Sequence, residues 1–234
     1  MRYFQFILFF AMLSPAVLLG QVLPHNHQGK LTAHTPTPPQ LELGSQEINE
    51  LQQGNYVIKQ FQSDSHGGGY IVQDINAPVE KVWSNILNFS KYTDWVNHVE
   101  KCEPYEQSED HLKVEFIIGA IGITYQYYID HIIDNKNHYM RWTLDYQRQS
   151  EIDDVVGFWY LQQHPLDPTQ TRLFYSVEIM LAGWVPGFIQ NLFSRNGLVD
   201  AASWVKKVSE PEVEQKPTSE HSPVMPLLMM PESD

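Results

Sequence analysis

A strand that leads directly into a helix start is the feature that most constrains this fold. Apolar and polar residues alternate from Thr171 to Ile179, which predicts a half-buried strand with Tyr175 and Val177 on its buried face. Pro186 then suits the first turn of a helix, where its missing N–H costs nothing. Apolar residues follow at helical spacing, at Phe188, Leu192, Phe193, Trp204, Val205 and Val208. We therefore expect a long C-terminal helix with one apolar face, interrupted or kinked near Asn196-Gly197 or restarted as a short helix from Val199.

A similar junction occurs earlier in the chain. Tyr70–Ile75 is predicted as a strand, and Pro78 precedes two short helices predicted over Val79–Leu87 and Phe89–Val96. The glycines in His66–Gly69 predict a hairpin turn before this strand. Turn-forming residues separate the remaining alternating segments, so we expect an antiparallel meander. Its other strands are Tyr56–Gln62, Val99–Gln107, His111–Gly119, Ile123–Ile133, His138–Gln147 and Asp153–Gln163.

Four segments of the chain resemble, in their sequence and their order, the START-like helix-grip superfamily, also called SRPBCC. They are Asn76–Trp83, Asn88–Trp95, Gly157–Leu161 and Thr171–Val177. That superfamily includes polyketide cyclases and dehydrases, coenzyme Q-binding proteins and bacterial START lipid-binding proteins. The resemblance covers residues 54–209 and implies an α+β fold, in which a curved antiparallel sheet wraps around a long C-terminal helix. It also implies that a cavity between the sheet and that helix holds the ligand.

The inward faces of the strands supply the candidate binding residues. We expect the ligand to contact Phe116, Tyr125, Tyr127, Trp142, Trp159, Tyr175, Val177, Phe188 and Leu192. Rings with one polar end suit a pocket that has a wet end. An aromatic stripe that faces a helix is also an ordinary core, so the pattern alone leaves both interpretations open.

Few residues suggest catalysis, and we predict no catalytic residue and no cofactor. His131 has the parity of the inward residues, so it is a candidate base or orienting donor, with a buried structural histidine as the ordinary alternative. Asp153-Asp154, Arg141, Arg172 and Glu178 are further candidates, and solvated pairs explain them equally well. Cys102 is the only cysteine, so no intrachain disulfide can form, and a nucleophilic role would need His98 or His111 nearby.

The charge excludes some partners. A formal net charge of -13 argues against nucleic acid, which is bound by neutralising phosphates, and against anionic membrane surfaces. We therefore predict a hydrophobic small molecule as the main partner. The superfamily resemblance also allows a transient membrane contact during ligand exchange.

Both ends of the chain differ from the middle. Residues 1–20, with Arg2 before an apolar run, predict a signal peptide, and an uncleaved anchor is the alternative. The Pro- and Thr-containing residues 21–53 predict a flexible leader. Its His25, His27 and His34 are potential metal ligands, but no carboxylate or thiol of the leader completes a site, so we predict no metal.

The acidic, Pro-rich residues 210–234 predict a disordered tail. Within this tail, residues 223–231 enclose an apolar patch from Val224 to Met230. The patch is either a loose flap on the domain or a docking segment for a protein partner.

The leading functional hypothesis is a secreted or periplasmic protein that binds or transfers a hydrophobic small molecule, such as a lipid, quinone or polyketide-like compound. The alternative is an enzyme of the polyketide cyclase or dehydrase type that uses the same cavity, which a buried and hydrogen-bonded His131 would favour. A protein-interaction domain with a closed, dry core is a third hypothesis.

The signal peptide is directly testable. Because the apolar run ends at small residues suited to signal peptidase, we expect exported protein to begin between Val17 and Gln21. N-terminal sequencing of the exported fraction measures this, and recovery of intact Met1 from membranes would contradict it.

Overall fold

The computed structural model describes residues 22–62, 66–120, 122–181 and 194–211. The strands are β1 (Val57–Gln62), β2 (His66–Ile75), β3 (Val99–Gln107), β4 (His111–Ala120), β5 (Ile123–Asp134), β6 (Tyr139–Leu144), β7 (Asp154–Gln163) and β8 (Thr171–Met180). The helices are α1 (Ser45–Gln52), α2 (Val79–Ile86), the 3-10 turn η1 (Phe89–Lys91), α3 (Tyr92–Trp95) and α5 (Arg195–Ser209). No helix of these residues is long and apolar enough to cross a membrane.

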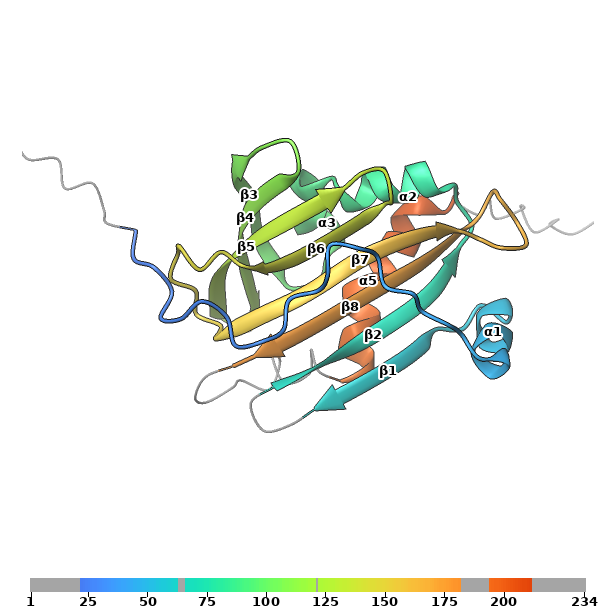
Figure 1. The fold of residues 1–234 in the computed structure, drawn as a ribbon, viewed down its shortest axis with the longest axis horizontal. Helices are drawn as coiled ribbons and strands as arrows, with labels where there is room; N and C mark the ends of the chain where they lie inside the picture. The colour runs from blue at the N-terminus through green and yellow to red at the C-terminus, as the bar shows by residue number, and fades with distance from the viewer. Residues whose placement is uncertain (1–21, 63–65, 121, 182–193, 212–234) are drawn as a thin grey trace, which may run out of the picture.

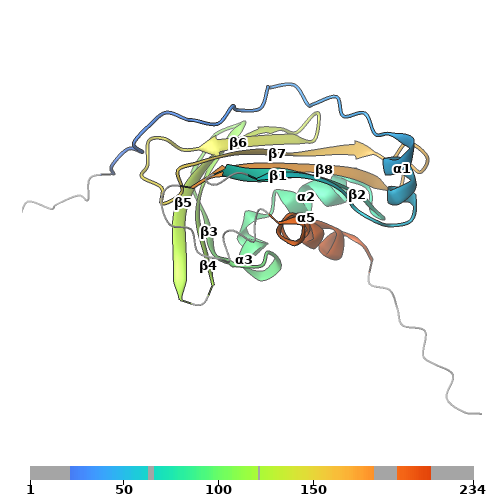
Figure 2. The same cartoon turned by 90° about the horizontal axis from the view of Figure 1, so that it is seen from below.

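The strands form one antiparallel sheet of eight strands in the order β1-β2-β8-β7-β6-β5-β4-β3 (Figure 1). After β2 the chain passes through α2, η1 and α3 to the opposite edge, and it then returns strand by strand until β8 pairs with β2. Figure 2 shows the sheet curving around α2, α3 and α5, which lie together on its concave side. This arrangement confirms the predicted helix-grip fold.

Close packing against α5 explains the glycine cluster. The cluster does not form the predicted turn, because Gly67, Gly68 and Gly69 lie within β2 and pair with β8. A Cβ at Gly69 would collide with the backbone oxygen of Lys59 and lie 2.8 Å from Leu198 Cδ1 of α5. The glycine therefore lets the helix approach β2 closely, which is the other common reason for glycine in a strand.

Helix α5 covers the sheet with a fully buried face that includes Leu198, Ala202 and Val205. Its N-cap is Ser194, whose hydroxyl accepts a hydrogen bond of 3.1 Å from Gly197 N, so Asn196-Gly197 lies in the first turn and causes no kink within α5. The earlier part of the predicted closing helix, with Phe188 and Leu192, lies outside the described residues.

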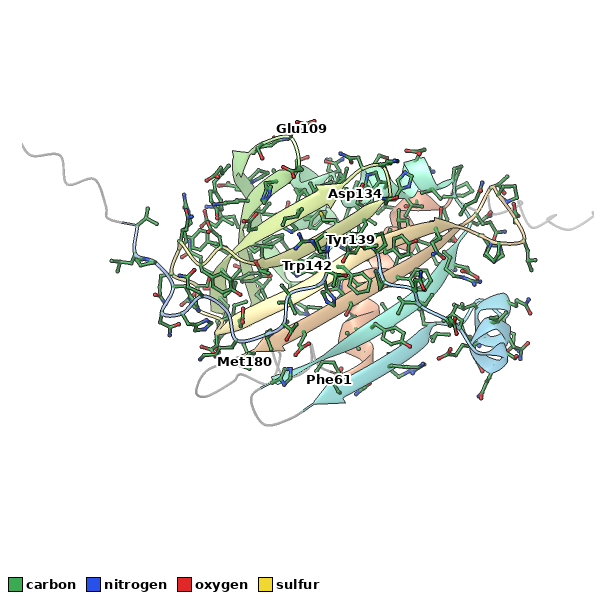
Figure 3. All side chains as sticks on the ribbon, viewed as in Figure 1. Phe61, Glu109, Asp134, Tyr139, Trp142 and Met180 are labelled. Atoms are coloured by element: carbon green, nitrogen blue, oxygen red, sulfur yellow. The ribbon has the colours of Figure 1, made fainter. Side chains whose placement is uncertain are left out.

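The part of the leader that precedes α1, residues 22–44, is the main departure from the sequence prediction. Instead of hanging free, it crosses the outer face of the sheet opposite α5 (Figure 2). The backbone N–H groups of Lys30 and Leu31 donate to the Asp154 carboxylate, at 2.5 and 2.8 Å, and the Lys30 ammonium lies 2.8 Å from Asp153 Oδ2. The hydroxyl of Tyr139, which is labelled in Figure 3, donates to Thr35 O at 3.0 Å. The sequence offered no sign of these contacts, because each joins residues more than 100 positions apart.

A second apolar core lies beneath the leader. Leu41 and Leu43 pack against a buried cluster on the outer face. That cluster consists of Leu51, Val57, Val72, Tyr139, Phe158 and Phe174. Central strands such as β7 are consequently buried on both faces, with nearly every residue from Asp154 to Leu161 inaccessible.

The leader contacts predict a local and a global effect of Asp154→Asn. The Asp154 side chain is fully buried, and it also accepts from the Tyr146 hydroxyl at 2.8 Å. An amide cannot satisfy all of these donors, so we expect a loss of about 2 kcal/mol in the free energy of unfolding. Trypsin should also cleave faster after Lys30, the only basic residue in the leader.

Urea unfolding and timed trypsin digestion measure the two effects. Asp94→Asn is the control, because Asp94 is exposed on α3 and, in the part of the chain that the structure describes, pairs with Lys91 alone, at 3.3 Å. Equal cleavage rates in wild type and Asp154→Asn would show that these hydrogen bonds do not hold the leader.

Candidate functional site

The candidate site is a cavity of about 200 Å³ between the concave face of the sheet and the helices. Its walls come from β3 through β8, from η1 and α3, and from α5 between Gly197 and Trp204. Three exposed residues, Asn97, His98 and Asp200, are the polar residues at its edge, and they mark the end that meets solvent. The remainder of the lining is mostly apolar and aromatic.

The structure places six of the nine predicted binding residues in the cavity wall. These are Phe116, Tyr127, Trp142, Trp159, Tyr175 and Val177. Tyr125 is not part of the lining, although it packs against the same core. Its parity on β5 was correct, but it lies one step closer to the exposed start of the strand at Ile123. Phe188 and Leu192 lie outside the described residues.

Sequence reasoning missed the helical side of the wall. Phe89 and Tyr92 from the η1–α3 segment and Trp204 from α5 all line the cavity. Tyr92 packs edge-on against Trp204, with ring centroids 5.0 Å apart, and its hydroxyl donates to Ile86 O at 2.6 Å. The aromatic content of the Phe89–Trp95 segment was the available signal.

The floor of the cavity depends on a glycine. Gly157 pairs with Trp142 across β6 and β7, and a Cβ at Gly157 would collide with the Trp142 indole. The glycine thus lets the indole lie flat over the neighbouring strand. Beyond it, Trp159 and Tyr175 pack with their centroids 4.2 Å apart.

His131 lines the interior of the cavity, as its parity predicted, whereas His98 lies at the exposed edge. His131 is buried, and its Nδ1 donates to Leu112 O at 3.0 Å. Since a carbonyl only accepts, this bond fixes the tautomer and leaves Nε2 as an acceptor. Burial lowers the pKa of His131 to about 4, although the bond to Leu112 acts in the opposite direction. His131 is therefore a neutral hydrogen-bonding group at pH 7.

Two tyrosine hydroxyls also face the cavity without a protein partner. Tyr127 and Tyr175 both line it, and neither hydroxyl makes a hydrogen bond within the described residues. Burial raises the pKa of each well above the usual value, so both remain protonated at neutral pH. They are positioned to donate to a ligand.

The other reactive candidates have structural surroundings. Cys102 is buried on β3, and burial raises the pKa of its thiol to about 12, so it is not a thiolate nucleophile at neutral pH. Arg172 makes a bidentate pair with Asp74, with both N–O distances at 2.8 Å. Glu178 pairs with His66 on the outer face.

His25, His27 and Asp153 form a cluster of metal-ligating residue types, with their ligand atoms within 4.8 Å of one another. In the structure Asp153 brings a carboxylate to the leader histidines, but these atoms are already engaged. Both His25 nitrogens bond to the backbone, at Asp153 O and Ser150 N, and the Lys30 ammonium contacts the Asp153 carboxylate. His34 packs instead against Phe158. These residues therefore attach the leader to the sheet, and their arrangement does not suit a metal site.

Comparison with known proteins agrees with this geometry. Residues 75–202 match the family described as polyketide cyclase/dehydrase and lipid transport. The chain belongs to this family. Its predicted place in the START-like superfamily is thereby confirmed, and no curated protein sequence matches the chain.

Two solved structures share the fold with this family member. One is the protein TTHA0849 from Thermus thermophilus, with 16% identity and a TM-score of 0.50, covering 60% of this chain and 94% of that one. The other is the Zhui aromatase/cyclase from a Streptomyces species, with 13% identity and a TM-score of 0.52, covering 62% and 93%. At these identities the likeness shows the fold alone.

The buried His131 makes stability depend on pH. Its pKa is about 4 in the folded state and about 6.5 when unfolded, so the unfolded chain binds more protons between these values. The folded state should therefore lose stability as the pH falls through this range, by a total on the order of 3 kcal/mol from this residue.

Urea unfolding of wild type and His131→Phe at pH 7 and pH 4.5 isolates this effect. We expect the loss on acidification to be smaller in His131→Phe by about 2 kcal/mol. Parallel pH dependence of the two proteins would mean that His131 is not buried in its neutral form.

Proposed function

We propose that this family member binds a hydrophobic small molecule, of the lipid, quinone or polyketide-like type, in the cavity between the sheet and α5, and carries it by sequestration. The observation that carries the proposal is the apolar cavity, into which only a few neutral polar groups project. Burial of apolar ligand surface would supply about 25 cal/mol per Å², and the polar groups would fix the orientation. The family description, which names both lipid transport and polyketide cyclisation, supports this class of ligand.

An enzyme of the cyclase or dehydrase type is the second candidate, and His131 is the observation that favours it. A histidine that lines an apolar cavity, with its tautomer fixed and Nε2 left as an acceptor, has the geometry of a proton acceptor. The similar Zhui protein is an aromatase/cyclase. However, a base whose pKa is about 4 is far from the value near the working pH that general base catalysis favours. Binding therefore has the stronger support.

The predicted signal peptide supports export, so we place the binding activity in a secreted or periplasmic setting as part of the proposal. Transient membrane contact would fit ligand exchange, and residues 223–231 remain a candidate docking segment for a protein partner. That segment lies outside the described residues.

Val177→Phe tests whether the cavity is the binding site. Val177 lines the cavity on β8, between its cross-strand neighbours Gly69 and Gly157. Leu198 and the Trp142 indole already occupy the space over these glycines, so a longer side chain at position 177 has only the cavity to extend into. We expect the phenyl ring to enter the cavity, lower the free energy of unfolding by less than about 1 kcal/mol, and abolish binding of Prodan, a neutral fluorescent naphthalene ketone.

Val72→Phe is the matched control. Val72 is fully buried in the closed outer cluster opposite Phe174, so the same change should cost about 1 to 3 kcal/mol and leave Prodan binding intact in the folded fraction. Prodan fluorescence and urea unfolding measure both variants. A large stability loss in Val177→Phe, with no binding by the wild type, would indicate a closed core.

A further inference from the structure

The polar groups of the cavity carry information about the ligand. Tyr127 Oη, Tyr175 Oη and His131 Nε2 have no hydrogen-bond partner within the described residues, although all three belong to the cavity wall. His131 is only 4% exposed and Tyr175 only 8%. Among the described residues, Gln73 Oε1 is the one unpaired side-chain atom that is fully buried, so these three atoms are still reached from the cavity. A ligand that fills the cavity would cover them, and it must then supply the hydrogen bonds that polar groups in protein interiors nearly always make.

The three groups belong to one aromatic frame. Phe116 stacks on Tyr127, with ring centroids 5.5 Å apart, and lies 6.3 Å from His131. Trp142 lies 6.0 Å from His131 on one side and 6.0 Å from Tyr175 on the other. Since packed rings hold the groups, their positions are fixed before a ligand arrives, and little ordering cost remains for binding.

The cavity offers nothing to neutralise a charge. The tyrosine hydroxyls and the histidine are uncharged at neutral pH, for the reasons given above. Among the described residues, no lysine or arginine lines the cavity, and the one lining residue with a carboxyl group, Asp200, is exposed at the mouth. Burying an unpaired charge costs far more than burying a hydroxyl. A carboxylate or phosphate ligand is therefore disfavoured.

Size and wall chemistry narrow the class further. The volume of about 200 Å³ is somewhat larger than the roughly 150 Å³ of an engineered apolar cavity that binds benzene. A molecule of one or two rings fits this space, whereas a two-chain lipid needs much more. The many aromatic side chains of the wall favour a flat ring system, which can pack edge-on or offset against them.

We propose, on the basis of the proposed binding function, that the ligand is a neutral aromatic compound of one or two rings. Its hydroxyl or carbonyl oxygen accepts hydrogen bonds from Tyr127 and Tyr175, and a ligand hydroxyl donates to Nε2 of His131. The polar cluster thus selects for an oxygen substituent, while the surrounding rings select for the ring system.

Three ligands with one ring system separate these contributions. Equilibrium dialysis at pH 7 compares 2-naphthol, naphthalene and 2-naphthoate, which carry a hydroxyl group, no substituent and a charged carboxylate. We expect 2-naphthol to bind roughly tenfold more tightly than naphthalene, the size expected for one or two well-placed hydrogen bonds. We expect 2-naphthoate to bind most weakly.

Variants locate the source of the preference. Tyr175→Phe and Tyr127→Phe each remove one donor, and each should weaken 2-naphthol binding roughly three- to tenfold while leaving naphthalene binding unchanged. Tyr160→Phe is the matched control, because Tyr160 stacks on Phe174 on the opposite face of the sheet, where its hydroxyl accepts from Gln162. It should change neither affinity.

The outcomes distinguish this inference from the function on which it rests. Equal affinities for naphthalene and 2-naphthol, unaffected by the tyrosine variants, would show that the polar cluster does not select the ligand. The proposal of a hydrophobic binding site would still hold. Tighter binding of 2-naphthoate than of 2-naphthol would contradict the inference that the ligand is neutral. Failure of all three compounds to bind would count against the proposed binding function itself.

Discussion

The packing of Trp204 determines much of this architecture. From α5 it contacts Tyr92 and Trp95 on α3 and Trp159 on β7, at centroid distances of 5.0, 5.9 and 6.2 Å. These large rings lie between α5 and the strands on the side of the helix that faces the cavity, whereas Gly69 brings the helix close to β2 near Leu198. The helix therefore touches the sheet closely on one side and leaves a cavity on the other.

An interior cavity lowers the free energy of unfolding, because the atoms around it lose packing contacts. At about 24 cal/mol per Å³, a cavity of about 200 Å³ corresponds to about 5 kcal/mol, a large fraction of the stability of a typical domain. The outer core offers compensation, because Leu41 and Leu43 of the leader cover the face of the sheet that the helices leave open. The family match begins only at residue 75, so this covering by the leader lies outside the part that defines the family. We infer that the leader stabilises the sheet without entering the site.

The sequence predicted local features well and long-range contacts poorly. Period-two alternation correctly placed Phe116, Trp142 and Tyr175 on the concave face, because strand parity is a local property. Parity does not fix depth along a strand, which is why Tyr125 was placed wrongly in the wall. The prediction of a free leader was wrong because it depended on long-range contacts. Lys30 of the leader contacts Asp153 and Asp154, which lie more than 100 residues away in the chain.

A shared fold leaves ligand choice to a few interior groups, so the cluster of Tyr127, Tyr175 and His131 deserves more weight than the size of the cavity. An apolar pocket discriminates by roughly 10- to 200-fold against a ligand that lacks one methylene group. A site built to hydrogen-bond a ligand hydroxyl can discriminate by up to about 10⁵-fold against an analogue that lacks the hydroxyl. The difference arises because a wrong ligand leaves buried polar groups unpaired. His131 fits this role better than proton transfer, since the burial that makes it a weak base also makes an unpaired Nε2 costly.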